Sequence, residues 1–129
     1  IQLEKLPAAN EKRKKLVKKY IELLTDTDAV SLPFLEIKNC EAVYHILPIL
    51  LAKGIDRLDI IARMKEDGIQ TSIHYPSFRD FTAFKDYNLN DAPIAEDIAK
   101  RELTLPLYPT MTINEVECVA KSLKKALEL

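Results

Sequence analysis

The chain has 129 residues, 47% of them hydrophobic, which suffices for one hydrophobic core but not for two ordinary domains. Its 19 basic and 20 acidic residues give a formal net charge of -1, so it lacks the basic excess typical of a nucleic-acid-binding surface. The longest apolar stretch, residues 42–52, falls well short of the roughly 20 residues that a membrane-spanning helix needs.

The first 24 residues predict a long amphipathic helix. Apolar residues recur at helical spacing with charges between them: Leu3, Leu6, Leu16, Val17, Tyr20, Ile21 and Leu24. Pro7 lies within this pattern, so the helix either kinks there or starts again near Ala8. Basic residues also crowd this helix: Lys12, Arg13, Lys14, Lys15, Lys18 and Lys19. We interpret them as a solvated helix face, because a basic cluster usually indicates binding only when it extends across a surface.

The middle of the chain predicts two strands joined by a helix. Residues 42–51 are apolar and β-branched, as in a buried strand, and Pro48 places that strand at an edge or at a bulge. Asp56 is a suitable N-cap for a helix that Gly68 closes. The buried face of that helix is predicted to hold Leu58, Ile61, Ala62 and Met64. Residues 69–75 form the second predicted strand, which a proline ends.

The last third predicts a short helix, a strand and a final helix. Pro93 suits the first turn of the short helix, after an irregular aromatic stretch over residues 77–90. Residues 103–108 are the third predicted strand, and Thr112 begins the last helix with a capping box. Its predicted buried stripe contains Ile113, Val116, Val119, Ala120, Leu123 and Leu127. This order of elements predicts an α+β fold, a small sheet with helices on one face.

The residues most suited to chemistry stand at the end of the second predicted strand. His74 and Tyr75 are adjacent, and successive strand residues point to opposite faces, so only one of them easily faces a given cleft. The structural alternative is a core histidine with a satisfied ring nitrogen and a tyrosine packed beneath the loop. Arg79 could bind a carboxylate or phosphate as a bidentate donor, or pair with Asp80 or Asp86 at the surface.

Other polar candidates have simple structural explanations. His45 lies in an apolar segment and is expected to be structural. Tyr108, between two prolines, either presents its hydroxyl at a sheet edge or fills the end of the core. A zinc site would need ligands beyond the two histidines, so no metal is expected. Cys40 and Cys118 lack metal-ligand spacing and are expected to be buried thiols in a reducing compartment.

Several motifs follow one another along nearly the whole chain. The most specific segment runs from Gly68 to the triplet His74-Tyr75-Pro76, and the second is residues 103–109 (LTLPLYP), followed by a terminal helix. Further matches are Gln2 to Leu6 with Asn10, Arg13 and Tyr20, the triplet Val43-Tyr44-His45, and residues 59–68 (DIIARMKEDG). Together these motifs resemble the C-terminal part of the DegT/DnrJ/EryC1/StrS family of sugar aminotransferases.

The resemblance implies an enzyme that uses pyridoxal 5′-phosphate (PLP) to transfer an amino group from an amino acid, usually glutamate, to a nucleotide-linked keto sugar. It also implies a mainly antiparallel sheet, as in the C-terminal domain of the aspartate-aminotransferase type fold. The lysine and the phosphate-binding loop that hold PLP belong to the family's large domain, and their motifs do not occur in this sequence. The chain alone is therefore expected to be inactive, with no catalytic or cofactor-binding residue of its own.

The resemblance further implies a division of the chain and a site. Residues 1–28 are expected to connect to a missing large domain, and residues 29–129 to form the small domain. His74, Tyr75 and Arg79 match the family's loop at one wall of the active-site cleft and are expected to bind substrate. Where many members have a proline and a second histidine, this sequence has Ser77 and Arg79, which predicts a different sugar or acid preference.

The sequence begins without a signal peptide, which favours a cytoplasmic protein, and without an initiator methionine, which suggests that it has been cut from a longer chain. The resemblance implies that the full-length enzyme is a homodimer. Alternatives remain open at this point. Some relatives use PLP for sugar dehydration with a histidine in place of the PLP lysine, and that position lies outside this chain. A self-standing small-molecule-binding regulatory domain is a second alternative. Nucleic-acid binding through the basic first helix is a third, which the near-neutral charge disfavours.

Overall fold

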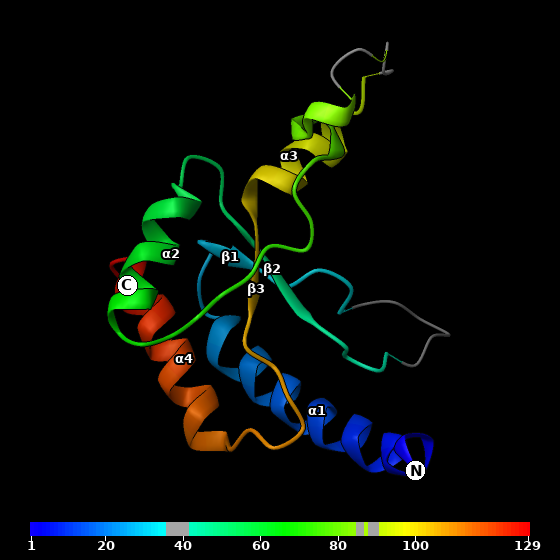
Figure 1. Cartoon of the computed structure of the whole chain (residues 1–129). Helices are drawn as coiled ribbons and strands as arrows, with labels where there is room; N and C mark the ends of the chain where they lie inside the picture. Colours follow the sequence, from blue (N-terminus) through cyan, green and yellow to red (C-terminus); the bar gives the residue numbers. More distant parts are fainter. Residues whose placement is uncertain (36–41, 85–86, 88–90) are drawn as a thin grey trace.

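The computed structural model describes residues 1–35, 42–84, 87 and 91–129 (Figure 1). Within these residues an antiparallel three-stranded sheet has the order β1-β2-β3. Its strands are β1 (Val30–Ser31), β2 (Leu47–Leu51) and β3 (Glu102–Leu105). The α-helices are α1 (Gln2–Leu24), α2 (Arg57–Glu66), α3 (Pro93–Arg101) and α4 (Ile113–Ala126), and the 3₁₀ turns are η1 (Phe78–Asp80) and η2 (Thr82–Phe84). The predicted α+β fold with a mainly antiparallel sheet is confirmed.

The hydrophobic core brings together the sheet, α4 and the second half of α1. Its helical members include Leu16, Val17, Tyr20 and Leu24 of α1 and Val116, Val119, Ala120 and Leu123 of α4, all buried. α1 and α4 pack directly against each other, and α2 packs against α4 (Figure 1). The first turns of α1 instead leave Ile1 and Leu3 exposed, and Pro7 lies inside the helix without ending it.

A buried tyrosine ties α1 to the end of β3. The side chain of Tyr20 is fully buried, and its hydroxyl donates a 2.9 Å hydrogen bond to the carbonyl oxygen of Pro106. Burial raises the pKa of Tyr20 well above its ordinary value, so the phenol stays protonated as a donor. Pro106 has no N–H to continue the ladder, and β3 ends at the preceding residue, Leu105.

The strand predicted over residues 42–51 is shorter than expected and is central. It begins only at Leu47, the first residue that pairs with β3, and Tyr44 upstream has a φ of 47°, outside the range that a strand allows. The prediction of an edge strand was wrong, since β2 pairs with both β1 and β3. However, β1 pairs only with Leu50 and Leu51, so Pro48 has a strand partner on one side alone, at Thr104 of β3.

The strand predicted over residues 69–75 was wrong in extent. Only Ser72 pairs with β3, where it exchanges backbone hydrogen bonds of 2.8 and 3.1 Å with Thr104. Two residues further on, the backbone N–H of His74 donates to the carboxylate of Glu102 instead of to a strand carbonyl. A side chain has thus taken the place of the next ladder bond.

The predicted helix ends are confirmed, but two predicted buried faces were wrong in part, because Ile113 is exposed on α4 and Leu58 is exposed on α2. Asp56 caps α2, and Gly68, at a φ of 80°, closes it in a Schellman motif, with Gly68 N–H bonded to Lys65 O and Ile69 N–H to Met64 O. α2 buries Ile60 and Met64, whereas Leu58 is exposed. None of the helices in the described ranges is long and apolar enough to cross a membrane.

Replacing Tyr20 with Phe is expected to lower the free energy of unfolding by about 1–2 kcal/mol, because the Pro106 carbonyl loses its donor in a part-buried place. Urea unfolding followed by circular dichroism measures this change. The control is Tyr87→Phe, which removes an exposed hydroxyl and should change stability by less than about 0.5 kcal/mol. Equal effects of the two substitutions would contradict a stabilising role for the Tyr20 hydroxyl.

Candidate functional site

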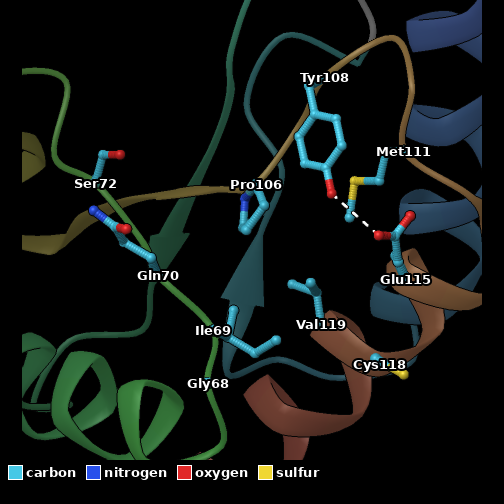
Figure 2. Close-up of a pocket in the computed structure, with 10 residues that line it drawn as sticks. All are labelled: Gly68, Ile69, Gln70, Ser72, Pro106, Tyr108, Met111, Glu115, Cys118 and Val119. Atoms are coloured by element: carbon cyan, nitrogen blue, oxygen red, sulfur yellow. Dashed lines mark hydrogen bonds between the residues drawn. The ribbon is translucent and has the colours of Figure 1, made fainter.

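The two motif-bearing segments, residues 68–76 and 103–109, lie side by side because Ser72 and Thr104 pair through their backbones. A pocket of about 440 Å³ opens between these segments and α4 (Figure 2). The first segment contributes Gly68, Ile69, Gln70 and Ser72 to the lining of the pocket. The segment that follows β3 contributes Pro106, Tyr108 and Met111, and α4 contributes Glu115, Cys118 and Val119. The structure therefore brings together two segments that are about 30 residues apart in sequence.

Tyr108 and Glu115 form the polar end of this pocket. In Figure 2 the two side chains point toward each other, and the Tyr108 hydroxyl donates to Glu115 Oε1 over 3.3 Å. The backbone N–H and the hydroxyl of Thr112 donate to Glu115 Oε2 over 2.7 and 2.8 Å, which completes the predicted capping box. These bonds lower the pKa of Glu115, while burial and the nearby carboxylate raise the pKa of Tyr108. The pair therefore offers a phenol and a carboxylate, and Tyr108 presents its hydroxyl rather than filling the core end.

His74 is held by two polar residues of β3. Its ring Nδ1 lies 2.9 Å from Thr104 Oγ1, and its backbone N–H donates to Glu102 Oε2 over 2.9 Å. Glu102 and Thr104 are only 4% and 5% exposed, whereas His74 is half-buried. Nδ1 is thus satisfied, and Nε2 has no hydrogen-bond partner among the residues that the structure describes. A substrate-binding role for His74 stays a prediction.

One neighbour of His74, Tyr75, differs from the expectation, and Arg79 pairs with a carboxylate. Tyr75 is 76% exposed and meets the His74 ring edge-on, with ring centroids 5.1 Å apart. The expectation of a tyrosine packed beneath the loop was therefore wrong. Arg79 forms an ion pair with Glu96 of α3, with 2.9 Å between Nε and Oε1. Asp86, one of the two expected partners of Arg79, lies outside the described residues.

Two other expectations need correction. His45 precedes β2 and is exposed, so it is not a structural histidine within an apolar strand. Cys118 is a free, exposed thiol on α4 rather than a buried one, because it lies on the α4 flank that borders the pocket. Cys40 lies outside the described residues. Among the residues that the structure describes, no three His, Cys, Asp or Glu side chains come together in a way that could hold a metal ion.

Sequence reasoning missed the residues that support the candidate site. Glu102 and Thr104, which bind His74, alternate with the core residues Leu103 and Leu105, and this alternation in β3 was the available signal. Glu96 was missed as a partner of Arg79, because nothing local in the sequence relates two residues 17 positions apart across a loop.

The fold and the pocket define a small α+β domain. The sequence model of the DegT/DnrJ/EryC1/StrS aminotransferase family matches residues 1–124. The chain therefore belongs to this family, and the resemblance drawn from its motifs is confirmed.

Particular relatives match the chain along almost its whole length. A dTDP-4-dehydro-2,3,6-trideoxy-D-glucose 4-aminotransferase from Saccharopolyspora spinosa is 34% identical, over 99% of this chain and 32% of the relative. The aminotransferase TlmJ from Streptoalloteichus hindustanus has a TM-score of 0.89 at 22% identity, over 98% of this chain and 34% of that one. NtdA from Bacillus subtilis, with bound cofactor PMP, has a TM-score of 0.75 at 29% identity, over 94% and 29%. This chain thus spans about a third of the length of the relatives it matches.

Because its folded pKa is lowered, Glu115 contributes stability that is fully present above its ordinary pKa of 4.5 and is lost as the pH falls through the lowered value. Gln at this position still accepts the capping bonds but does not titrate. As the pH falls below 4.5, the free energy of unfolding is therefore expected to decrease less for Glu115→Gln than for the wild type. Urea unfolding across this pH range measures the difference.

The control for this experiment is Glu11→Gln, which changes an exposed glutamate of α1 outside any capping box. It should keep the wild-type dependence of stability on pH. If Glu115→Gln lost stability as steeply as the wild type, the pKa of Glu115 would not be lowered by folding.

Proposed function

We propose that this chain is the small domain of a PLP-dependent aminotransferase that transfers an amino group from an amino acid, with glutamate as the donor, to a nucleotide-linked keto sugar. The observation that carries the proposal is 34% identity, over 99% of the chain, to a dTDP-4-dehydro-2,3,6-trideoxy-D-glucose 4-aminotransferase. The bound PMP of NtdA, which is the aminated form of PLP, supports the choice of cofactor.

The pocket of Figure 2 does not suit PLP. Such a site needs a lysine that forms an imine with the aldehyde and hydrogen-bond donors for the phosphate. The pocket of Figure 2 contains neither lysine nor arginine, and its charged group is the carboxylate of Glu115, which repels a phosphate. We therefore place the cofactor in a large domain that accompanies this chain, consistent with relatives that are about three times as long.

An exposed aromatic surface supports such a partner domain. Its members come from the segment that runs from Tyr75 through α3: Tyr75, Phe78, Phe81, Phe84, Tyr87, Ile94 and Ile98, all exposed. The Phe84 ring contacts those of Phe78 and Tyr87, with centroids 5.7 and 6.0 Å apart. Exposed apolar clusters of this kind mark interaction surfaces. We propose that the large domain covers this surface within a homodimeric enzyme.

The proposed division of the chain follows the same logic. Residues 1–28 would connect the two domains, and residues 29–129 would form the small one. The exposed Ile1, Leu3 and Leu6 at the start of α1 support the connecting role, since these apolar side chains have no cover within the described chain. The second half of α1 belongs to the core and anchors the connector to the small domain.

Within the enzyme, His74, Tyr75 and Arg79 would form one wall of the substrate cleft. The exposed Tyr75 ring offers a surface and a hydroxyl to a ligand, and the Nε2 of His74 offers a ring nitrogen. Arg79 is positioned by its ion pair with Glu96, which fixes the guanidinium beside the aromatic surface. This wall contacts substrate, while the chemistry at the cofactor belongs to the large domain.

In the full-length enzyme, His74→Ala and Arg79→Ala are each expected to lower kcat/KM for amino transfer by roughly 10-fold, the effect of losing one well-placed hydrogen bond or ion pair. PLP content, read from its absorbance, should stay at the wild-type level. The measurement is amino transfer from glutamate to a dTDP-linked 4-keto sugar. His45→Ala, which changes the exposed histidine before β2, is the matched control and should keep wild-type activity.

Unchanged kcat/KM in both variants would remove these residues from the substrate wall. Loss of bound PLP in either variant would show that the residue supports the cofactor rather than the substrate. A wild-type enzyme that released water from the sugar without gaining an amino group would instead favour the dehydratase alternative.

A further inference from the structure

A polar network on one face of β3 surrounds His74. Glu102 and Thr104 stand two residues apart in the strand, so their side chains share a face, while Leu103 and Leu105 point to the core on the other. The Glu102 carboxylate accepts a 2.9 Å hydrogen bond from the backbone N–H of His74 and another from the Thr104 hydroxyl. Thr104 Oγ1 in turn lies 2.9 Å from Nδ1 of the His74 ring.

The proton count of this network determines the state of the imidazole. A hydroxyl carries one proton, and an ionised carboxylate can only accept. Once the Thr104 hydroxyl donates to Glu102, its oxygen can only accept from His74, so the ring proton must lie on Nδ1. In the neutral imidazole the other nitrogen, Nε2, then carries a lone pair, and it has no partner within the described ranges.

A second contact fixes the start of β3. Nη1 of Arg57, the first residue of α2, donates to the carbonyl oxygens of Ala99 over 2.5 Å and of Glu102 over 3.0 Å. The junction between α3 and β3 is thereby held by a side chain from a third element. This contact leaves the Glu102 carboxylate free to bind Thr104 and His74 in a constant geometry.

We propose that Glu102 and Thr104 are positioning residues that fix the Nδ1–H tautomer of His74, so that Nε2 accepts a hydrogen bond from a hydroxyl or amino group of the ligand. The ligand part of this proposal rests on the proposed function, in which His74 faces the substrate cleft. A neutral Nε2 lone pair attracts an O–H or N–H donor and repels a phosphate oxygen, which has no proton to give. His74 therefore recognises the sugar portion of a nucleotide sugar, not its diphosphate.

The tautomer is tested by ¹⁵N NMR of histidine-labelled full-length protein at about pH 8.5, where free imidazoles are neutral. The His74 signal is assigned with a His74→Gln variant. The expected spectrum shows a proton on Nδ1 and a bare Nε2 for His74. A proton on Nε2 in the wild type would overturn the inference, whatever the ligand of the enzyme.

Variants at Thr104 test the link between the network and the ring. Thr104→Val removes the hydroxyl at nearly constant shape, so the Nδ1–H preference of His74 should be lost, whereas Thr104→Ser keeps a hydroxyl and should restore it. An unchanged tautomer in the Val variant would contradict the positioning role. If the Val variant did not fold, Glu102→Gln would provide the same test, because an amide can donate to Thr104 and reverse the chain of protons.

The ligand assignment is tested by calorimetric titration with two probes, dTDP and dTDP-glucose. Thr104→Val should weaken dTDP-glucose binding by about 3- to 10-fold and leave dTDP binding unchanged, because the donors that we assign to Nε2 are the glucose hydroxyls, which dTDP lacks. Equal weakening of both probes, or of neither, would refute recognition of the sugar by His74. A wild-type protein that bound neither probe would count against the proposed function, while the NMR result would still decide the tautomer.

Discussion

Alternate residues of a β-strand point to opposite faces, and in β3 this constraint joins the core to the candidate site. Leu103 and Leu105 are buried in the core, and Glu102 and Thr104 on the other face hold the backbone and ring of His74. A shift of the β2–β3 register by one residue would put the carboxylate of Glu102 into the core. The burial of Leu103 and Leu105 therefore disfavours such a shift, and it also keeps Glu102 and Thr104 on the face where His74 lies.

Side chains from other elements fix the two ends of β3 where strand pairing stops. Tyr20 of α1 donates to the carbonyl of Pro106 after the strand, and Arg57 of α2 donates to the carbonyl of Glu102 at its start. Arg101, which immediately precedes β3, donates to the carbonyl of Leu51 over 2.6 Å. Because part-buried carbonyls without donors are costly, these contacts restrict the strand to one position. The pocket beside β3 is consequently built on a rigid frame.

The pocket and the His74 network supply hydrogen-bond donors and acceptors. In our proposal, the lysine and the phosphate-binding groups that the cofactor needs belong to the large domain. This division fits a chain that spans about a third of its relatives' length. It also fits the exposed aromatic surface near His74, where a wall of a cleft and a domain interface would adjoin. An active site that is shared between domains brings substrate-binding groups of one to the cofactor of the other.

The sequence by itself determined the helices, their caps and the family, because periodicity, capping residues and short motifs are local. It extended the strands too far, since residues 42–46 and 73–75 have strand-forming composition but only pairing partners make a strand. Only the tertiary structure decided that His74 binds Glu102 and Thr104, which lie 28 and 30 residues away, and that Tyr75 and Cys118 are exposed. The physical reason is that these properties depend on which distant segments β3 brings together, and no local pattern records that choice.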